Sequence, residues 1–128
     1  MLTRKPLDRR MQIRLKRAYV APADEDGQRI LVDRLWPRGL SKDAARIDLW
    51  LKDVAPSSGL RKWFGHDPDK WPEFSQRYRA ELKDNPALPA LLEIAQHADI
   101  TLVYAAKDER HNQAVVLKDL LEQAIAQA

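Results

Sequence analysis

Two polar clusters in the sequence combine side chains that can bind an anion with side chains that can move a proton. The first is the segment 33–39, which reads DRLWPRG. Arginine binds phosphate or carboxylate through paired hydrogen bonds and stacks on aromatic rings. We therefore expect Arg34 and Arg38 to bind an anion beside the indole of Trp36. The alternative is an internal ion pair between Asp33 and Arg34 that only holds the turn.

The second cluster is the segment 107–112, which reads KDERHN and precedes an apolar stripe with helical spacing. The start of a helix exposes N–H groups and a positive dipole end, both of which favour anions. We expect Lys107 and Asn112 to bind the same anion as the first cluster. Against this interpretation, Asp108 is a good N-cap, and such a cap would occupy those N–H groups and repel a phosphate. The candidates for proton transfer in the two clusters are Asp33, Asp108 and His111.

Other residue types exclude several kinds of site. The chain has no cysteine, which excludes disulfides, thiolate nucleophiles and cysteine-ligated metals. Its three histidines lack the paired spacing of zinc ligands, so no metal site is expected, and no cofactor is expected either. Ser57 lacks the Gly-x-Ser-x-Gly sequence of serine hydrolases. His66 is expected to be a hydrogen-bonding loop residue, and His97 to lie at a helix end.

Polarity patterns predict the elements that position the two clusters. The segment 30–35, which is apolar until Asp33 and Arg34, and the continuous run in 100–106 are typical of strands buried on both faces. The alternation in 13–17 is typical of a half-buried edge strand. A short strand is also expected within 47–51. Apolar stripes with helical spacing are predicted in four segments: 60–64, 71–82, 88–95 and 114–124.

Strands that alternate with helices indicate an α/β fold, here a single compact domain with a small, mostly parallel sheet flanked by helices. Ligands of such sheets bind beyond the carboxyl ends of the strands. The two polar clusters follow the two apolar strands, so we expect them to meet at one edge of the sheet. In the last helix, Leu117 is expected in the core and Gln113 on the solvent face.

Positive charge is concentrated near the beginning of the chain. The net charge is +3, but residues 1–20 hold seven basic residues and one acidic residue. We expect residues 1–10 to be a flexible basic segment and 11–128 to be the single domain. A basic face can bind nucleic acid or another polyanion, whereas charges on an edge strand also prevent edge-to-edge pairing. The residues of this face are Arg9, Arg10, Arg14, Lys16 and Arg17.

No apolar run reaches the ~20 residues of a membrane-spanning helix. The basic N-terminal residues also lack the apolar stretch of a signal peptide. A cytoplasmic location is therefore expected.

Four ordered motifs resemble those of the YeaO-like family, also called domain of unknown function 488. They are VDRLWPRG (32–39), APSSGLRKWFGHD (55–67), W-x-x-F-x-x-x-Y-x-x-E-L (71–82) and LVYAAKD followed by NQAVVL (102–117). The resemblance covers about residues 11–122 and implies a compact bacterial α/β protein, but it supplies no activity. The motif positions in this chain are Asp33, Arg34, Trp36, Arg38, Gly39, Arg61, Trp63, Phe64, Lys107, Asp108 and Asn112.

The main hypothesis is a small cytoplasmic protein that binds an anionic, phosphate-bearing small ligand at the carboxyl edge of its sheet. The alternative is a nucleic-acid or protein interaction module that uses the basic N-terminal face, for which only weak, non-specific nucleic-acid binding is expected. A structural subunit of a homo-oligomer is a third hypothesis. Neither the oligomeric state nor the presence of an enzymatic reaction follows from the sequence.

Overall fold

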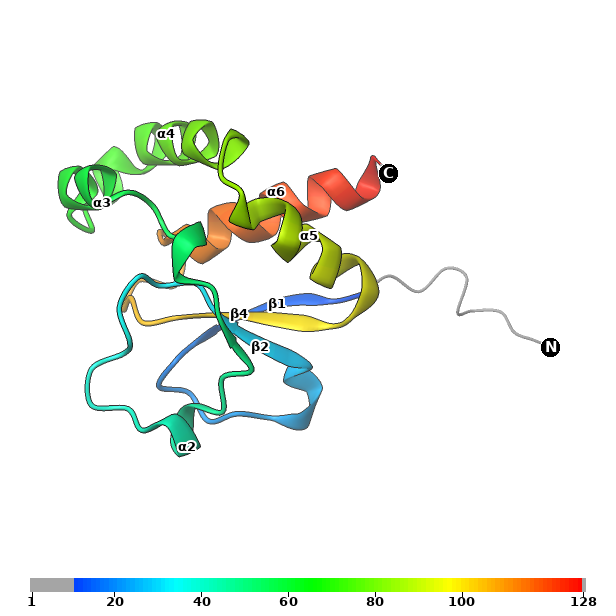
Figure 1. The fold of residues 1–128 in the computed structure, drawn as a ribbon. Coiled ribbons are helices and arrows are strands. Elements are labelled where there is room, and N and C mark those ends of the chain that lie inside the picture. The colour runs from blue at the N-terminus through cyan, green and yellow to red at the C-terminus, as the bar shows by residue number, and fades with distance from the viewer. Residues whose placement is uncertain (1–10, 128) are drawn as a thin grey trace.

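Four short strands form a fully parallel sheet in the computed structural model, which describes residues 11–127 (Figure 1). The strands are β1 (Ile13–Arg17), β2 (Gln28–Leu31), β3 (Leu49–Trp50) and β4 (Ile100–Tyr104). Their order in the sheet is β1-β4-β2-β3, so β1 is an edge strand as expected. In the central pairings, Leu102 lies opposite both Leu15 and Ile30. The predicted α/β class is confirmed.

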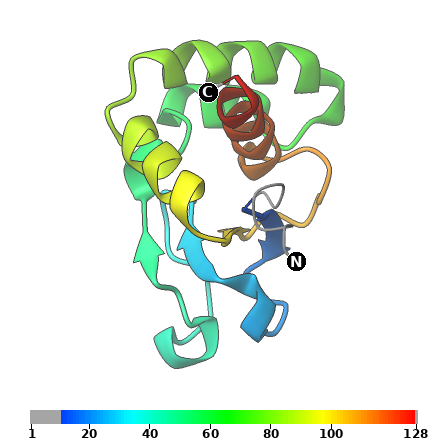
Figure 2. The same ribbon diagram turned by 90° about the vertical axis from the view of Figure 1, so that its right-hand side faces the viewer.

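The longer helices lie on one face of this sheet (Figures 1 and 2). The helices are α2 (Lys42–Ala45), α3 (Ser58–Phe64), α4 (Trp71–Lys83), α5 (Ala87–His97) and α6 (Gln113–Ala126). Three short 3-10 turns, η1 (Asp24–Asp26), η2 (Lys52–Val54) and η3 (Pro68–Lys70), connect the elements. Each predicted apolar stripe therefore lies on one of the helices α3 to α6. None of the helices in residues 11–127 is long and apolar enough to cross a membrane.

The main core fills the space between the sheet and helices α3 to α6. Ile30 and Leu102 of the sheet are fully buried in the same cluster as Phe74, Tyr78 and Leu117. Burial of this apolar surface is the main favourable contribution to folding. All five residues of β4 are buried, which explains why its sequence is apolar apart from Thr101 and does not alternate.

The opposite face of the sheet is covered by the chain between β2 and β3. Leu31 and Val103 point to this face and are fully buried. Trp36, Leu40 and Ile47 of the connecting segment pack on them. Short α2, which is capped by the Ser41 side chain, is the one helix of this connection. The second layer is therefore made mostly of irregular chain, and the same chain carries the first polar cluster.

The predicted strand boundaries need correction. β2 ends at Leu31, and residues 33–35 form a bend, where the sequence predicted a strand through Leu35. The backbone N–H of Val32 still donates to Val103, but the next contact to β4 is made by the Asp33 side chain. β4 likewise ends at Tyr104. The predicted flexible segment 1–10 lies outside the described residues.

Candidate functional site

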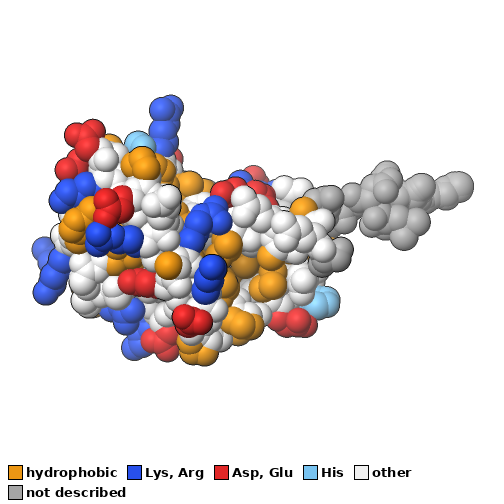
Figure 3. Space-filling model, turned by 90° about the horizontal axis from the view of Figure 1, so that it is seen from above, with side chains coloured by type: hydrophobic (Ala, Val, Ile, Leu, Met, Phe, Trp, Pro, Cys, Tyr) orange, Lys and Arg blue, Asp and Glu red, His pale blue; other side chains and the backbone are white. Residues whose placement is uncertain are grey.

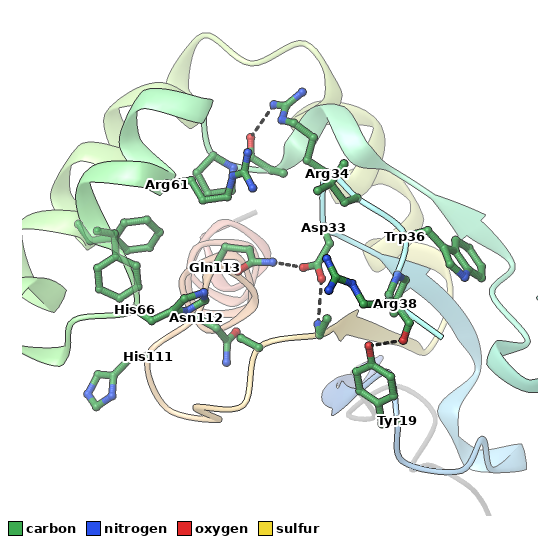
Figure 4. A pocket seen from close by; sticks show the side chains of 18 residues that line it. Tyr19, Asp33, Arg34, Trp36, Arg38, Arg61, His66, His111, Asn112 and Gln113 are labelled. Atoms are coloured by element: carbon green, nitrogen blue, oxygen red, sulfur yellow. Dashed lines mark hydrogen bonds between the residues drawn. The ribbon is translucent and has the colours of Figure 1, made fainter. Parts of the chain in front are cut away.

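A cleft of about 480 Å³ lies beyond the carboxyl ends of β2 and β4 (Figure 4). The loop after β2 and the turn after β4 both contribute to it, so the two polar clusters meet as expected. Helix α3, Phe74 of α4 and the start of α6 also contribute to its wall. The labelled residues of Figure 4 are Tyr19, Asp33, Arg34, Trp36, Arg38, Arg61, His66, His111, Asn112 and Gln113.

Asp33 lies in the middle of the cleft and is held by two neutral donors (Figure 4). One carboxylate oxygen accepts a hydrogen bond of 2.9 Å from the backbone N–H of Ala105, and the other accepts from the Gln113 side chain. Burial raises the pKa of Asp33 above its ordinary value, although these hydrogen bonds and the charges of Arg61 and His66 act to lower it. Asp33 is therefore a fixed, partly desolvated acid.

Three arginines line the cleft: Arg34 and Arg38 from the loop after β2, and Arg61 from α3. Arg34 makes one long hydrogen bond, 3.5 Å from Nη2 to the carbonyl of Ala55, and its Nε is buried without a partner. Within residues 11–127, none of the three guanidinium groups forms an ion pair with a carboxylate. Three arginines against one aspartate leave the lining with excess positive charge. The Asp33–Arg34 ion pair, which was the alternative to anion binding, is absent from these residues.

The start of α6 corrects one prediction. The N-cap is Asn112, whose side-chain oxygen accepts from the backbone N–H groups of Ala114 and Val115. Asp108, the predicted cap, instead closes the preceding turn by accepting from the N–H groups of Arg110 and His111. The N-cap of α6 was predicted wrongly because both aspartate and asparagine are common as N-caps and in such turns.

Asp108 and His111 form a pair of their own. Nδ1 of His111 lies 2.8 Å from the Asp108 carboxylate, and the imidazole meets the Trp71 ring edge-on at 5.3 Å between centroids. Hydrogen bonds from the backbone N–H of Arg110 and from His111 lower the pKa of Asp108. Asp108 is not among the residues that line the cleft, whereas His111 is.

The other predicted binding residues differ in what they present to the cleft. Lys107 is exposed and is not among the lining residues. Trp36 lines the cleft, but its indole N–H donates to the carbonyl of Leu40 at 2.6 Å, and its ring also packs on the sheet. Asn112 lines the cleft with a side chain whose oxygen and nitrogen both make local hydrogen bonds. Arg34 and Arg38 therefore carry most of the predicted binding capacity.

Arg61, His66 and Gln113 line the cleft without having been predicted as site residues. Arg61 belongs to the second motif of the family resemblance, which was the available signal. Gln113 was expected to face solvent, but it is half-buried and donates to Asp33. His66 follows Gly65 in the left-handed conformation, at φ 59°, an uncommon backbone for a residue with a side chain.

The described part of the basic N-terminal face makes contacts within the domain. Arg14 donates to the carbonyl of Glu25, Lys16 forms a 2.8 Å ion pair with Asp26, and Arg17 donates to the carbonyl of Ala106. Arg9 and Arg10, the other members of this face, lie outside the described residues. On the helix-covered side, Figure 3 shows acidic and basic side chains interspersed.

Comparisons with known proteins support the family that the four motifs resemble. The family model that matches residues 12–128 is described as the inactive DUF488-N3 subclade. Uncharacterized protein YeaO of Escherichia coli (strain K12) is 42% identical over 112 residues, which are 87% of this chain and 97% of YeaO. An uncharacterized protein of Mycobacterium tuberculosis (strain ATCC 25618 / H37Rv) is 42% identical over 113 residues, 88% of this chain and 96% of that protein. No solved structure matches.

Proposed function

The chain belongs to the YeaO-like DUF488 family, and we propose that it binds an anionic, phosphate-bearing small ligand in the cleft at the carboxyl edge of its sheet. The observation that carries the proposal is the set of unpaired arginines around Asp33. Arg34, Arg38 and Arg61 come from two different elements, line one cleft and make no ion pair within residues 11–127. An anion would supply the missing negative charge.

The buried Nε of Arg34 is a second support. An unsatisfied buried donor costs about 1–3 kcal/mol, and more when it is charged. Arginine offers five N–H donors, and the hydrogen bond that this guanidinium makes to Ala55 is long. A phosphate oxygen would satisfy such donors through charge-assisted hydrogen bonds.

The size and lining of the cleft favour an organic ligand over an inorganic ion. Its volume lies within the roughly 300–1,000 Å³ of typical small-molecule sites. Pro56, Phe64, Phe74 and Ala106 give part of the wall an apolar surface. Such a mixture of apolar wall and a few polar groups is typical of sites that bind small molecules.

Binding without turnover is the form of this function that we favour. The matched family model is described as an inactive subclade, which supports it. Asp33 is held by hydrogen bonds from Ala105 and Gln113, and the Asp108 carboxylate is outside the cleft lining and paired with His111. We further propose that the protein works in the cytoplasm.

Thermal unfolding in sodium phosphate tests the proposal, with sodium chloride at equal ionic strength as the reference. A ligand that binds only the folded state raises the melting temperature as its concentration exceeds Kd. We expect phosphate to raise the melting temperature of the wild type and to have a much smaller effect on Arg61→Gln. The matched control is Arg110→Gln, which removes the same charge from an exposed residue outside the cleft lining. A wild type that does not respond to phosphate, or equal responses of all three proteins, would overturn the proposal.

A further inference from the structure

Asp33 is an unexpected residue for a site that binds an anion. It lines the cleft together with the arginines, and its negative charge would repel a phosphate group placed beside it. A carboxylate in this position has two possible roles. It either neutralises the arginines, or it binds another part of the ligand.

The geometry argues against neutralisation by direct pairing, although the charge of Arg61 still acts on Asp33 and lowers its pKa. Within residues 11–127 Asp33 makes no ion pair with any of the lining arginines, and its two hydrogen bonds come from the neutral groups of Ala105 and Gln113. A carboxylate offers about four lone-pair positions. Two are therefore used, and those that remain belong to a side chain that lines the cleft (Figure 4).

We propose that Asp33 is a specificity-determining residue that accepts a hydrogen bond from a hydroxyl or amino group of the ligand. This inference rests on the proposed function and narrows it. The ligand is a phosphate ester whose carbon skeleton carries hydrogen-bond donors, while the arginines bind its phosphate. Sugar phosphates and nucleoside monophosphates share this chemistry.

The way Asp33 is held makes it suitable for such recognition. The Ala105 N–H is fixed by the end of β4, and Gln113 is fixed by the first turn of α6, so the carboxylate has little rotational freedom. A preorganised acceptor discriminates strongly, because a ligand without a matching donor leaves it desolvated and unpaired. Gln113 is in this scheme a positioning residue.

Asp33→Asn is a conservative test, because Gln113 can adapt to it. In the variant, the asparagine oxygen can accept from Ala105 while its amide nitrogen faces Gln113. Rotation of the Gln113 amide by a half turn then presents its oxygen to that nitrogen, so both hydrogen bonds are kept. The variant loses the negative charge and part of the acceptor capacity that faces the cleft, and retains the size of the side chain.

The experiment compares two phosphate esters by isothermal titration calorimetry. Methyl phosphate has the phosphate and no hydroxyl or amino donor on its carbon skeleton, whereas ribose 5-phosphate has several. We expect the wild type to bind ribose 5-phosphate at least about tenfold more tightly, as one charge-assisted hydrogen bond allows. In Asp33→Asn this preference should fall to about twofold or less, while the affinity for methyl phosphate stays equal or rises because a repelling charge is gone.

The outcomes separate this inference from the proposed function. If the wild type binds both esters with equal affinity, or if Asp33→Asn binds methyl phosphate and keeps the full preference, the role of Asp33 is overturned and anion binding stands. If the wild type binds neither ester, both proposals fail. Even if Asp33→Asn does not fold, the comparison of the two esters in the wild type shows whether the ligand must carry a hydrogen-bond donor.

Adenosine 5′-monophosphate distinguishes the two classes of ligand, sugar phosphates and nucleoside monophosphates. Tighter binding than ribose 5-phosphate indicates a nucleotide, and equal or weaker binding indicates a sugar phosphate.

Discussion

Asp33 and Ala105, which are 72 positions apart in the sequence, are joined by a 2.9 Å hydrogen bond from the Ala105 backbone N–H to the Asp33 carboxylate. The bond begins where the backbone pairing of β2 with β4 stops, so a side chain continues the contact between the two strands. Beyond this bond the segments that follow β2 and β4 separate, one toward Arg34 and the other toward Asn112. The cleft opens between these segments. Asp33 therefore connects the two strand ends and is also the acid in the middle of the cleft.

The charge of Asp33 should reduce stability as the pH rises. Burial raises its pKa above 3.8, the value that the group has when it is unperturbed. The folded protein therefore holds this proton more tightly than the unfolded chain does. The resulting stability is fully present below pH 3.8 and is lost as the pH rises through the folded-state pKa.

We expect Asp33→Asn, which cannot lose a proton, to become more stable relative to the wild type as the pH rises through this window. Urea unfolding of both proteins on either side of the window measures the difference. A difference that does not change with pH would contradict the raised pKa.

Asp26 should show the opposite pH dependence. Burial alone would raise its pKa, but hydrogen bonds from Lys16, the Ala23 N–H and Arg29 hold the pKa below 3.8. Its contribution to stability is thus present above pH 3.8 and is lost as the pH falls through the folded-state value. Asp26→Asn leaves buried Arg29 without its ion-pair partner, so we expect a loss of about 3–5 kcal/mol near neutral pH. In urea unfolding the loss should shrink in acid, and a loss that persists unchanged would contradict this prediction.

Much of the sheet could be predicted from the sequence because its strands differ in burial. The buried run of β4 has no polar face. The sequence of β1 alternates, although only Ile13 is buried there and the other four residues are partly exposed, so both patterns are readable without a structure. The meeting of the two polar clusters followed from the parallel arrangement. The covering of the second sheet face could not be predicted, because Trp36 and Leu40 lie in irregular chain that has no periodic pattern.

The candidate site was only partly predictable for a related reason. Arg34 and Arg38 lie in the loop that follows β2, so strand topology places them. Arg61 reaches the cleft from α3, and no local pattern distinguishes it from a solvated helix residue. Gln113 faces Asp33 because α6 begins one residue after Asn112, and the true N-cap could not be chosen between Asp108 and Asn112 from sequence alone.

Two glycines should respond in opposite directions to replacement by alanine. Gly27 has φ +62°, and an added Cβ would lie 2.2 Å from the backbone oxygen of Asp99, so Gly27→Ala combines strain with a backbone clash. We expect it to cost about 3 kcal/mol or more. Gly59 lies in α3 with open space around the added Cβ, and Gly59→Ala should stabilise by about 0.4–1 kcal/mol. Thermal or urea unfolding of the two variants checks the pair. A tolerated Gly27→Ala would mean that the connection between Asp99 and Gly27 is looser than the structure shows.

Nucleic-acid binding, the alternative function, should be weak and non-specific. Arg14, Lys16 and Arg17 already donate to groups of the domain, so fewer of their N–H groups remain for phosphates. Affinity for a mixed-sequence DNA duplex, measured by fluorescence anisotropy, should fall steeply with salt in proportion to the phosphates neutralised. Binding that selects one sequence and persists at high salt would favour the interaction-module hypothesis over the small-ligand site.

Arg38→Ala distinguishes an anion site from an internal salt-bridge network. The Arg38 side chain is exposed and has no ion pair within residues 11–127, and the hydrogen bond that Tyr19 donates to its backbone carbonyl survives the substitution. Without phosphate, the free energy of unfolding should therefore change by only about 0.5 kcal/mol or less. The contrasting variant is Arg29→Ala. Arg29 is buried, forms a 2.7 Å ion pair with Asp26 and donates to the carbonyl of Ala45, so its loss should cost about 3 kcal/mol or more.

Phosphate adds the second half of this comparison. If Arg38 belongs to an anion site, the rise in melting temperature that phosphate causes in the wild type should be reduced in Arg38→Ala, because the variant has lost a cation that lines the cleft. Differential scanning calorimetry with and without phosphate measures both effects on the same samples. An Arg38→Ala protein that is as unstable as Arg29→Ala in the absence of phosphate, beside a wild type that ignores phosphate, would mean that the arginines of the cleft serve the fold. The positive charge of these arginines would then be explained without a bound ligand.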